Sequence, residues 1–404
     1  MLLQPGMSLT CIHPGAEPAV FRSRWLMISP DRILENHCLE TVNHRVAGIS
    51  QRSFDGGIQD LGPGLIMPLL VNAHTHLELS ALNNRLDYTK GFEAWVKELL
   101  IERETIGPEA LAEAASKEID GLMAHGTGAV GEISTLGLTA DLLNTSDLGG
   151  IWFNEVLGSN IEIISEHNVP APNGRSSKSP AFRFSMAGHA PHTTSPELLC
   201  HAKKHTAHRH LPFSIHLAES QAESDFINGE NRGWAEFLMS RGIDISGWPV
   251  GNKSPVAYLD ELGILDETTL AVHLIRTSEA DLDILARTRA KVCLCPRSNH
   301  NLHKRLPDIE GMLARGLAPA LGTDSLASCD SLSLFDEMAF VREKYPGVSP
   351  GTVLSMAGIN GAQALGLAPV MGRLEKKCWA GFLYVDLESS SPAQILESLT
   401  VNEI

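Results

Sequence analysis

Residues 65–80, LIMPLLVNAHTHLELS, form an apolar run that ends in two histidines one residue apart. Successive side chains on a strand point to opposite faces, so His74 and His76, separated by Thr75, project to the same side of the strand end. Two neutral imidazoles held side by side supply half of the ligands of a typical zinc or iron site. The competing interpretation is a chance pair in a chain with 17 histidines. The rest of the sequence has to decide between the two.

The composition is that of a soluble globular protein with room for a large core: 404 residues, 43% hydrophobic and 20% charged. No apolar stretch approaches the length of a membrane span, and the N-terminus lacks the features of a signal peptide, so we expect a cytoplasmic protein. Seven cysteines, of which only Cys293 and Cys295 lie close together, predict neither a disulfide framework nor a paired-cysteine zinc site. The formal net charge of −16 argues against nucleic acid or an anionic membrane as a partner and favours a small-molecule substrate. A homodimer is one option for the assembly.

The hydrophobic pattern changes along the chain. Residues 1–64 are short β-like pieces separated by Pro, Gly and Asp. After Pro68, short apolar strands alternate with amphipathic segments, which is typical of parallel βαβ units. Eight such units indicate an α/β fold of the (β/α)8 TIM-barrel type, with its active site at the C-terminal ends of the strands. The predicted strands are residues 69–73, 127–134, 150–156, 182–189, 211–217, 270–274, 290–295 and 317–323.

An open, doubly wound sheet is the competing architecture, and it would require a glycine-rich turn after its first strand. The one glycine fingerprint, GTGAVG at 126–131, follows a helical stretch and enters a strand. A dinucleotide-binding loop has the opposite order, so we interpret this segment as a tight turn. The triplet His76-Leu77-Glu78 matches the HxE of cytidine-type zinc deaminases, but their PCxxC motif is absent from the chain.

Histidines and one carboxylate stand at the ends of several predicted strands. A single histidine near a strand end is usually a structural residue. In a barrel, however, these ends converge on one mouth, so the side chains would meet with the nitrogen and oxygen donors that Zn²⁺ or Fe²⁺ prefers. The residues are His74 and His76 on the first strand, His189 on the fourth, His216 on the fifth, His273 on the sixth and Asp324 on the eighth.

Seven motifs in sequence order resemble one known family: NAHTHLELS, GHAPHTTSPEL, IHLAES, VHLIRTSEADLDILA, CPRSNHNL, ALGTDSLAS and NGAQALGL. They are similar to the amidohydrolase superfamily, and within it to the chlorohydrolase and aminohydrolase branch with its adenosine-type and aminodeoxyfutalosine deaminases. The resemblance implies a small β-sandwich domain built from both chain ends, residues 1–64 and 367–404, beside a barrel at 65–366. In place of the family's Gly-x-x-Ala-Asp the chain has CWAGF at 378–382, which leaves open whether this domain has its return strand.

The resemblance also implies one divalent metal, Zn²⁺ or Fe²⁺, held by four residues. No lysine stands at the end of the third or fourth strand, so a carbamylated lysine bridging two metals is not expected. The implied ligands are His74, His76, His216 and Asp324.

Roles in catalysis follow from the resemblance together with the chemistry of deamination. Removing an amino group from an amidine-like carbon needs a nucleophilic water and a proton for the ring nitrogen. A metal lowers the pKa of its bound water, and Glu219, three residues after His216, is expected to move the proton. His273 is expected to stabilise the developing oxyanion, and Asp324 to accept a proton from the water.

Substrate contacts are carried over from the same family. His189 matches its substrate-contacting histidine. Glu78, in HLELS, and Trp95, in the FxxW segment at 92–95, are expected to line the pocket, although aromatic residues three apart on a helix are more often core. His192 is interpreted as a loop residue ahead of a helix cap.

These features predict a metal-dependent deaminase acting on the 6-amino group of an adenine nucleoside, with aminodeoxyfutalosine of the alternative menaquinone pathway as a candidate substrate. A guanine or 8-oxoguanine deaminase and a hydrolase of C–Cl or amide bonds are the alternatives. Chlorohydrolases of this branch can lack the glutamate of HLAE, which this chain has. A non-catalytic binding protein on the same barrel is a more distant alternative, because it would be expected to lose metal ligands.

Overall fold

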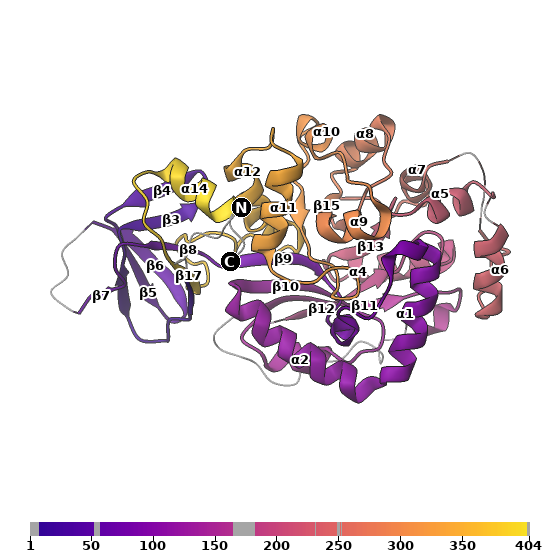
Figure 1. Ribbon diagram of the computed structural model, residues 1–404, viewed down its shortest axis with the longest axis horizontal. Helices are drawn as coiled ribbons and strands as arrows, with labels where there is room; N and C mark the ends of the chain where they lie inside the picture. Colours follow the sequence, from indigo (N-terminus) through magenta and orange to yellow (C-terminus); the bar gives the residue numbers. More distant parts are fainter. Residues whose placement is uncertain are drawn as a thin grey trace.

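A closed barrel of eight parallel strands forms the larger part of the molecule (Figure 1). The computed structural model describes residues 8–51, 57–164, 182–230, 232–248, 251 and 253–401. The strands lie in chain order around the barrel, and a parallel bridge between Thr75 and Asp324 joins the last to the first. The eight predicted strands and the TIM-type barrel are therefore confirmed. They are β9 (Leu70–Thr75), β10 (Thr127–Ser134), β11 (Gly149–Val156), β12 (Arg183–Gly188), β13 (Phe213–Leu217), β14 (Thr269–His273), β15 (Lys291–Leu294) and β16 (Ala320–Leu321).

Helices cover the outside of the barrel. Three of them begin at a Ser-Pro pair, where Ser195, Ser254 or Ser349 accepts a hydrogen bond from a first-turn backbone N–H and the proline has no N–H to leave unpaired. Within the described ranges no helix has both the length and the apolar character required to span a membrane. The helices are α1 (Phe92–Ile106), α2 (Pro108–Ala124), α3 (Ala140–Thr145), α4 (Pro196–Ala207), α5 (Gln221–Ile227), α6 (Arg232–Ser240), α7 (Pro255–Glu261), α8 (Glu279–Thr288), α9 (Pro296–His303), α10 (Ile309–Ala314), α11 (Leu334–Lys344), α12 (Pro350–Met356) and α13 (Ile359–Ala364), with short 3₁₀ turns η1 (Leu77–Leu82), η2 (Tyr88–Lys90) and η3 (Ile161–Ile163).

The interior of the barrel is filled by buried apolar side chains from alternate positions of its strands, such as Val71, Ile151 and Val272. All seven cysteines are free, as the sequence predicted. Gly126, with φ of +83°, forms the turn from α2 into β10. This left-handed conformation favours glycine, so Gly126 makes the tight turn that was predicted, and the rest of GTGAVG is the start of β10 and not a dinucleotide loop.

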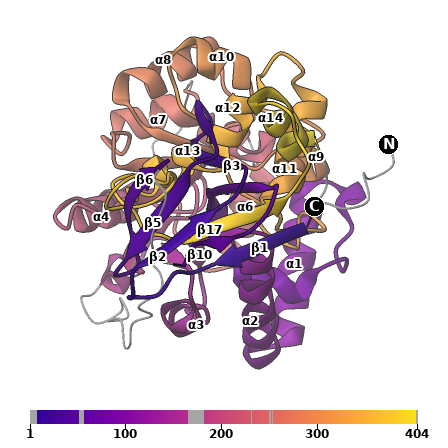
Figure 2. The same cartoon turned by 90° about the vertical axis from the view of Figure 1, so that its left-hand side faces the viewer.

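A smaller β domain lies beside the barrel and contains two sheets. One has the strand order β1-β17-β8-β3-β4 and the other β6-β5-β2-β7. The return strand β17 pairs antiparallel with both β1 and β8, among the N-terminal strands (Figure 2). The domain therefore has its return strand although the usual motif is missing. The strands are β1 (Ser8–Ile12), β2 (Ala19–Arg22), β3 (Trp25–Ser29), β4 (Arg32–Glu35), β5 (Cys38–Val42), β6 (Arg45–Ser50), β7 (Gln59–Asp60), β8 (Leu65–Pro68) and β17 (Phe382–Asp386).

The borders between the two parts differ in detail from the expected ones at 65 and 367. Strand β8, which begins at residue 65, belongs to the small five-stranded sheet, because it pairs with β3 and β17. The barrel begins at Leu70. Near the other end of the chain, helix α14 (Pro392–Val401) packs on α11 and α12 of the barrel, because its Ile395 and Leu399 are buried in the core that those helices share.

Candidate active site

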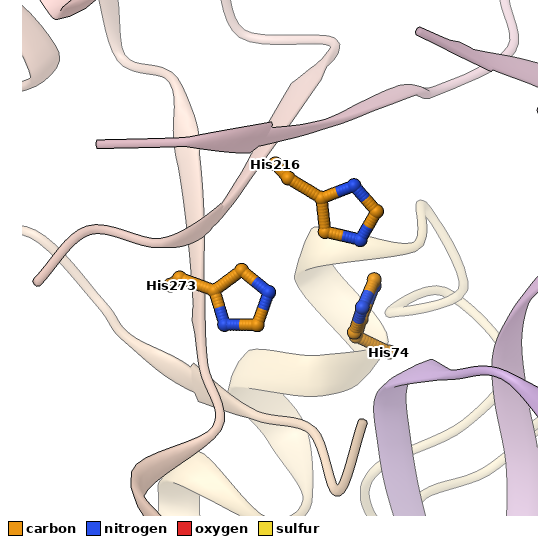
Figure 3. A group of neighbouring side chains, drawn as sticks. All are labelled: His74, His216 and His273. Carbon is orange, nitrogen blue, oxygen red and sulfur yellow. The ribbon is translucent and has the colours of Figure 1, made fainter. Parts of the chain in front are cut away.

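Three imidazoles from three different strands converge at the C-terminal end of the barrel (Figure 3). The ring of His74 lies 5.0 Å from that of His216 and 5.7 Å from that of His273, measured between centroids. One ring nitrogen of each lies within 4.8 Å of the others. The barrel topology thus brings together residues that are almost 200 positions apart in the sequence.

His76 and Asp324 complete the group that the sequence predicted. The Nε2 atoms of His76 and His216 are 3.1 Å apart. Asp324 Oδ1 lies 3.7 Å from His76 Nε2 and 3.9 Å from His74 Nε2. The structure therefore places all four expected metal ligands in one cluster.

Backbone hydrogen bonds between the first and last strands of the barrel hold this cluster in place. The backbone carbonyl of His74 accepts hydrogen bonds from the N–H groups of Thr323 and Asp324, and the N–H of His76 donates to Asp324 O. Gly322 allows the close approach, since a Cβ at this position would lie 2.7 Å from that of His74. Asp324 itself has φ of +59°, a costly conformation for a non-glycine residue, which turns its side chain into the mouth of the barrel.

The electrostatics of the cluster fit a divalent metal ion. Burial, and then the neighbouring rings, lower the pKa values of His74, His76 and His216, so these imidazoles are neutral, which is the form that binds metals. Both ring nitrogens of His74 are buried without a hydrogen-bond partner. Two nitrogens bound to one tetrahedral zinc at about 2.1 Å would be roughly 3.4 Å apart, close to the observed separation of His76 and His216.

Asp324 presents one oxygen to the cluster and keeps the other occupied. Its Oδ2 accepts hydrogen bonds from the hydroxyls of Ser298, at 2.5 Å, and Ser328, at 2.9 Å. Oδ1 is left to face His74 and His76. The two serines therefore fix the orientation of the carboxylate, as outer hydrogen bonds do for metal ligands.

Glu219 lies beside the cluster, on the loop that follows β13. Its Oε1 is 3.8 Å from His273 Nε2 and 3.2 Å from His303 Nε2. Burial alone would raise the pKa of Glu219, but His273 and the hydrogen bond with His303 outweigh it and hold the pKa below its ordinary value. Glu223 fixes the loop by accepting hydrogen bonds from the N–H groups of Ala218 and Glu219.

His273 is oriented by a second residue. Its Nδ1 lies 2.9 Å from Asn299 Oδ1 and donates to it, so Nε2 is the nitrogen that faces Glu219. Like Asp324, His273 is in the left-handed region, with φ of +76°. Asn299 and His303 both come from α9. Asn299 lies in the motif CPRSNHNL, residues 295–302, and His303 follows it directly, but only the structure shows that these two side chains point toward the site.

The expected substrate residues take different positions. His189 lines the cavity with its ring 5.2 Å from that of His216, and its Nδ1 is 2.6 Å from Thr193 Oγ1. The carboxylate of Glu78 instead accepts hydrogen bonds from Ser134 Oγ and from the N–H groups of residues 135, 136 and 138. Both of its oxygens hold the loop after β10, while the residue also lies in the wall of the cavity, so the expected substrate contact stays a prediction. Trp95 lines the cavity and donates from Nε1 to Ala327 O.

A cavity of about 250 Å³ opens above the cluster. His192, interpreted from the sequence as a loop residue, lies in its wall, and its Nδ1 is buried without a hydrogen-bond partner. The wall is largely apolar, with two arginines among its other members. Its apolar residues are Leu79, Phe92, Trp95, Val96, Leu99, Leu100, Leu157, Trp234, Phe237, Leu238, Ile243 and Leu302.

Two buried glutamates were missed by the sequence analysis. Glu132 accepts hydrogen bonds from Thr75 Oγ1 and Leu77 N and so braces the strand end that carries the two histidines. Glu155 lines the cavity, where Thr135 Oγ1 donates to its Oε2 and its Oε1 is buried without a partner. Burial raises the pKa of both carboxyls. Each sits inside an apolar strand, so nothing in the local sequence distinguishes it.

Comparison with known proteins places the chain in a family. A model of the amidohydrolase family matches residues 63–403. The chain therefore belongs to the amidohydrolase family, and it is a hydrolase that acts on carbon–nitrogen bonds.

Individual members are also similar to it. Aminodeoxyfutalosine deaminase of Deinococcus radiodurans is 32% identical over 339 residues, covering 80% of this chain and 79% of that protein. A 5-methylthioadenosine/S-adenosylhomocysteine deaminase of Nitratidesulfovibrio vulgaris is 26% identical over 376 residues, covering 88% and 80%. The crystal structure of Helicobacter pylori aminofutalosine deaminase in complex with methylthio-coformycin shares the fold, with a TM-score of 0.80, 21% identity and coverage of 95% and 96%.

Proposed function

We propose that the protein is a metal-dependent aminohydrolase that removes the 6-amino group of an adenine nucleoside as ammonia, with aminodeoxyfutalosine, and hence menaquinone biosynthesis, as the first choice of substrate and pathway. The relative from Deinococcus radiodurans carries that name, and the methylthioadenosine/adenosylhomocysteine deaminases share the base. The observation that carries the proposal is the position of Glu219, 3.8 Å from His273, inside the cavity and beside the four-residue cluster.

One divalent metal, Zn²⁺ or Fe²⁺, would be held by His74, His76, His216 and Asp324. When bound, such an ion supplies a Lewis acid that lowers the pKa of water to near neutrality. The remaining tasks fall to the side chains around it.

Glu219 is assigned the proton transfer to the ring. The ring must lose its aromaticity before ammonia can leave, so a ring nitrogen has to receive a proton as the water oxygen bonds to C6. A carboxylate that stays ionised in the resting site can take a proton from water and deliver it to that nitrogen. The hydrogen bond with His303 holds the carboxylate in place. The amino group then receives the second proton of the water, which Asp324 accepts first, and leaves as ammonia as the C6–N bond breaks and a carbonyl remains at C6.

His273 and Asp324 are assigned to the oxygen that adds to C6. The Nε2 of His273 faces the same space as Glu219, and Asn299 fixes the ring that carries it. With Nδ1 donating to Asn299, the ring stabilises negative charge that develops on this oxygen when Nε2 also carries a proton and donates it in a hydrogen bond. Asp324, whose Oδ1 is free of other hydrogen bonds, can accept a proton from the attacking water.

Replacing His273 by Gln should lower kcat roughly 10- to 100-fold, because Gln keeps an N–H group but not the position of the ring. Metal content, measured by elemental analysis, should stay at the wild-type level, since His273 is not among the four assigned ligands. A variant that lost its metal together with its activity would show instead that His273 is a ligand.

The choice of substrate is tested by measuring kcat/KM on a panel of aminodeoxyfutalosine, methylthioadenosine, adenosylhomocysteine, adenosine, guanine and 8-oxoguanine. Loss of absorbance near the adenine maximum and release of ammonia report turnover. We expect the adenine nucleosides to react and aminodeoxyfutalosine to have the highest kcat/KM. A clear preference for guanine or 8-oxoguanine would reject the adenine assignment, and hydrolysis of chlorinated triazines or amides in their place would reject deamination.

A further inference from the structure

A second hollow lies outside the cavity of the candidate active site, on the side of the barrel away from the small β domain (Figure 1). It has a volume of about 480 Å³ and is formed by α5, by the first residues of α7 and α8, and by the segments that follow β14 and α9. It shares no lining residue with the cavity above the histidine cluster. Its lining is polar and carries charges that the proposed reaction does not use.

Two arginines line this hollow without a carboxylate partner. Arg276 donates from Nη1 to Gln221 Oε1, which is a neutral acceptor. The Nε atom of Arg276 is buried and has no hydrogen-bond partner among the residues that the structure describes. Arg305, exposed just beyond α9, forms no ion pair with any residue in the described ranges. Two guanidinium groups without a carboxylate are notable in a chain whose net charge is −16.

The other two charged groups of the lining already have partners. The ammonium group of Lys253 pairs with Glu261. The carboxylate of Asp281 accepts a hydrogen bond from Ser254 Oγ on one oxygen, and on the other it accepts the N–H of Ser278 at 2.8 Å. Both oxygens of Asp281 are therefore held at the N-terminal cap of α8, and this carboxylate does not neutralise the two arginines.

The two arginines act on each other through their charges. Burial, and then the charge of Arg305, lower the pKa of Arg276. Asp225 and Glu223 act in the opposite direction and do not outweigh these two causes. Asp225 accepts a hydrogen bond from Gln221 Nε2 at 2.6 Å. Because like charges at short range repel, an anion placed between the two guanidinium groups would lower the free energy of the folded protein.

We infer that this hollow binds a phosphate group, free or at the end of a small metabolite, between the guanidinium groups of Arg276 and Arg305. Two positive charges match the two negative charges of a phosphate dianion, and a guanidinium group donates to phosphate oxygens in pairs. A monocarboxylate would leave one of the two charges without a counter-ion. The volume of about 480 Å³ leaves room for the rest of a metabolite.

Two hydroxyl groups of the lining are available as further donors. Ser224 Oγ and Thr277 Oγ1 each lie 3.4 Å from a backbone carbonyl oxygen, which is a long contact for a hydroxyl donor. Rotation about the bond that carries each hydroxyl would let it donate to a phosphate oxygen instead. The lining thus offers both charged and neutral donors to one ligand.

The hollow adjoins the loop that carries Glu219. The N–H of Arg276 donates to Ala218 O at 2.8 Å, and Gln221, which accepts from the side chain of Arg276, is two residues beyond Glu219. A phosphate bound here would connect α5 to the segment that follows β14. Its binding requires neither the metal nor a nucleoside, so the inference does not depend on the proposed function.

The first test is isothermal titration calorimetry of the purified full chain with inorganic phosphate, at about pH 8, where the phosphate is mainly a dianion. We expect one phosphate to bind per chain and Tm to rise as phosphate is added, because a ligand that binds the native state stabilises it. Sodium chloride and sodium acetate at the same ionic strength should have little effect. Absence of binding, or an equal effect of chloride or acetate, would overturn the inference.

The second test locates the bound phosphate. Arg276→Gln should raise the Kd for phosphate roughly 10- to 100-fold, since its half-buried guanidinium makes charged hydrogen bonds, and Arg276→Lys should restore part of the loss. Arg305→Gln should raise it about 3- to 10-fold, because Arg305 is exposed. Arg32→Gln, an exposed arginine on β4 outside the hollow, is the matched control and should bind phosphate as the wild type does.

Wild-type affinity in both glutamine variants would place the phosphate elsewhere, for example on the metal, and the inference would be wrong. Arg305→Gln keeps this result decisive even if Arg276→Gln does not fold, because an exposed side chain without an ion pair in the described ranges can be replaced without loss of a stabilising contact.

The third test distinguishes the two sources of the phosphate group. Ribose 5-phosphate and ribose are titrated beside inorganic phosphate, each into the wild type and into Arg305→Gln. Tighter binding of ribose 5-phosphate would identify a phosphorylated metabolite as the ligand, and tighter binding of inorganic phosphate would identify the free ion. Either result supports the site, provided that Arg305→Gln weakens it. Equal binding of ribose and ribose 5-phosphate would reject it, because the phosphate group would then contribute nothing.

Discussion

Replacing Glu219 by Gln should lower kcat by about 10²- to 10⁴-fold, the range expected for a group that transfers the proton of the reaction. The amide has nearly the same shape as the carboxylate, so the contact with His303 and the loop held by Glu223 can persist. It cannot, however, accept a proton from water. Steady-state deamination of the best adenine nucleoside in the panel measures the loss, while thermal unfolding and metal content should match the wild type.

The control for this variant is Glu230→Gln, an exposed glutamate just beyond α5 and outside the cavity, which should leave the rate unchanged. A Glu219→Gln enzyme with near wild-type turnover would mean that another residue moves the proton. His303 would then be the next group to test, because its Nε2 lies 3.2 Å from the same carboxylate oxygen.

The barrel could be predicted from the sequence because each of its strands is an apolar run of ordinary length between polar segments. The cluster of histidines and a carboxylate could be predicted because His74, His216 and Asp324 stand at the ends of such runs, and a closed barrel brings strand ends together. Once the barrel topology is known, it follows that the side chains at the C-terminal ends of the strands meet at one end of the barrel.

The parts that could not be predicted depend on side-chain direction. Glu155 sits within an apolar strand and lines the cavity with one oxygen unpaired, whereas both oxygens of Glu78, which also lines the cavity, are held by the loop after β10. His273 and Asp324 point into the site because of backbone conformations that non-glycine residues rarely adopt. No spacing rule encodes those choices, since they are imposed by contacts distant in the sequence. The hydrogen bonds of Glu78 to the loop after β10 and the unpaired oxygen of Glu155 could therefore be identified only from the structure.

The cluster should hold one metal ion per chain, because only one nitrogen of His216 is available to bind a metal. His216 Nδ1 lies 2.6 Å from the carbonyl of His189 and must donate to it, so only Nε2 is free to bind a metal. A second group of residues, Glu155, His189 and His216, also has metal-ligand character, but it shares this histidine. With one lone pair available, His216 can serve one ion. The cavity wall that the structure describes contains no lysine that could bridge two.

Replacing His216 by Ala should therefore empty the site and abolish activity, because it removes one of three nitrogen ligands outright. Asp324→Asn should also lose activity, but less metal, since the amide oxygen can still face the ion while it can no longer accept a proton. Elemental analysis should give about one Zn²⁺ or Fe²⁺ per chain for the wild type and for His201→Ala, an exposed histidine on α4 that serves as control. A chelator should inactivate the wild type and added metal restore it. Two tightly bound ions per chain, or full metal in His216→Ala, would contradict the assignment, because the only nitrogen that His216 can offer would not be needed.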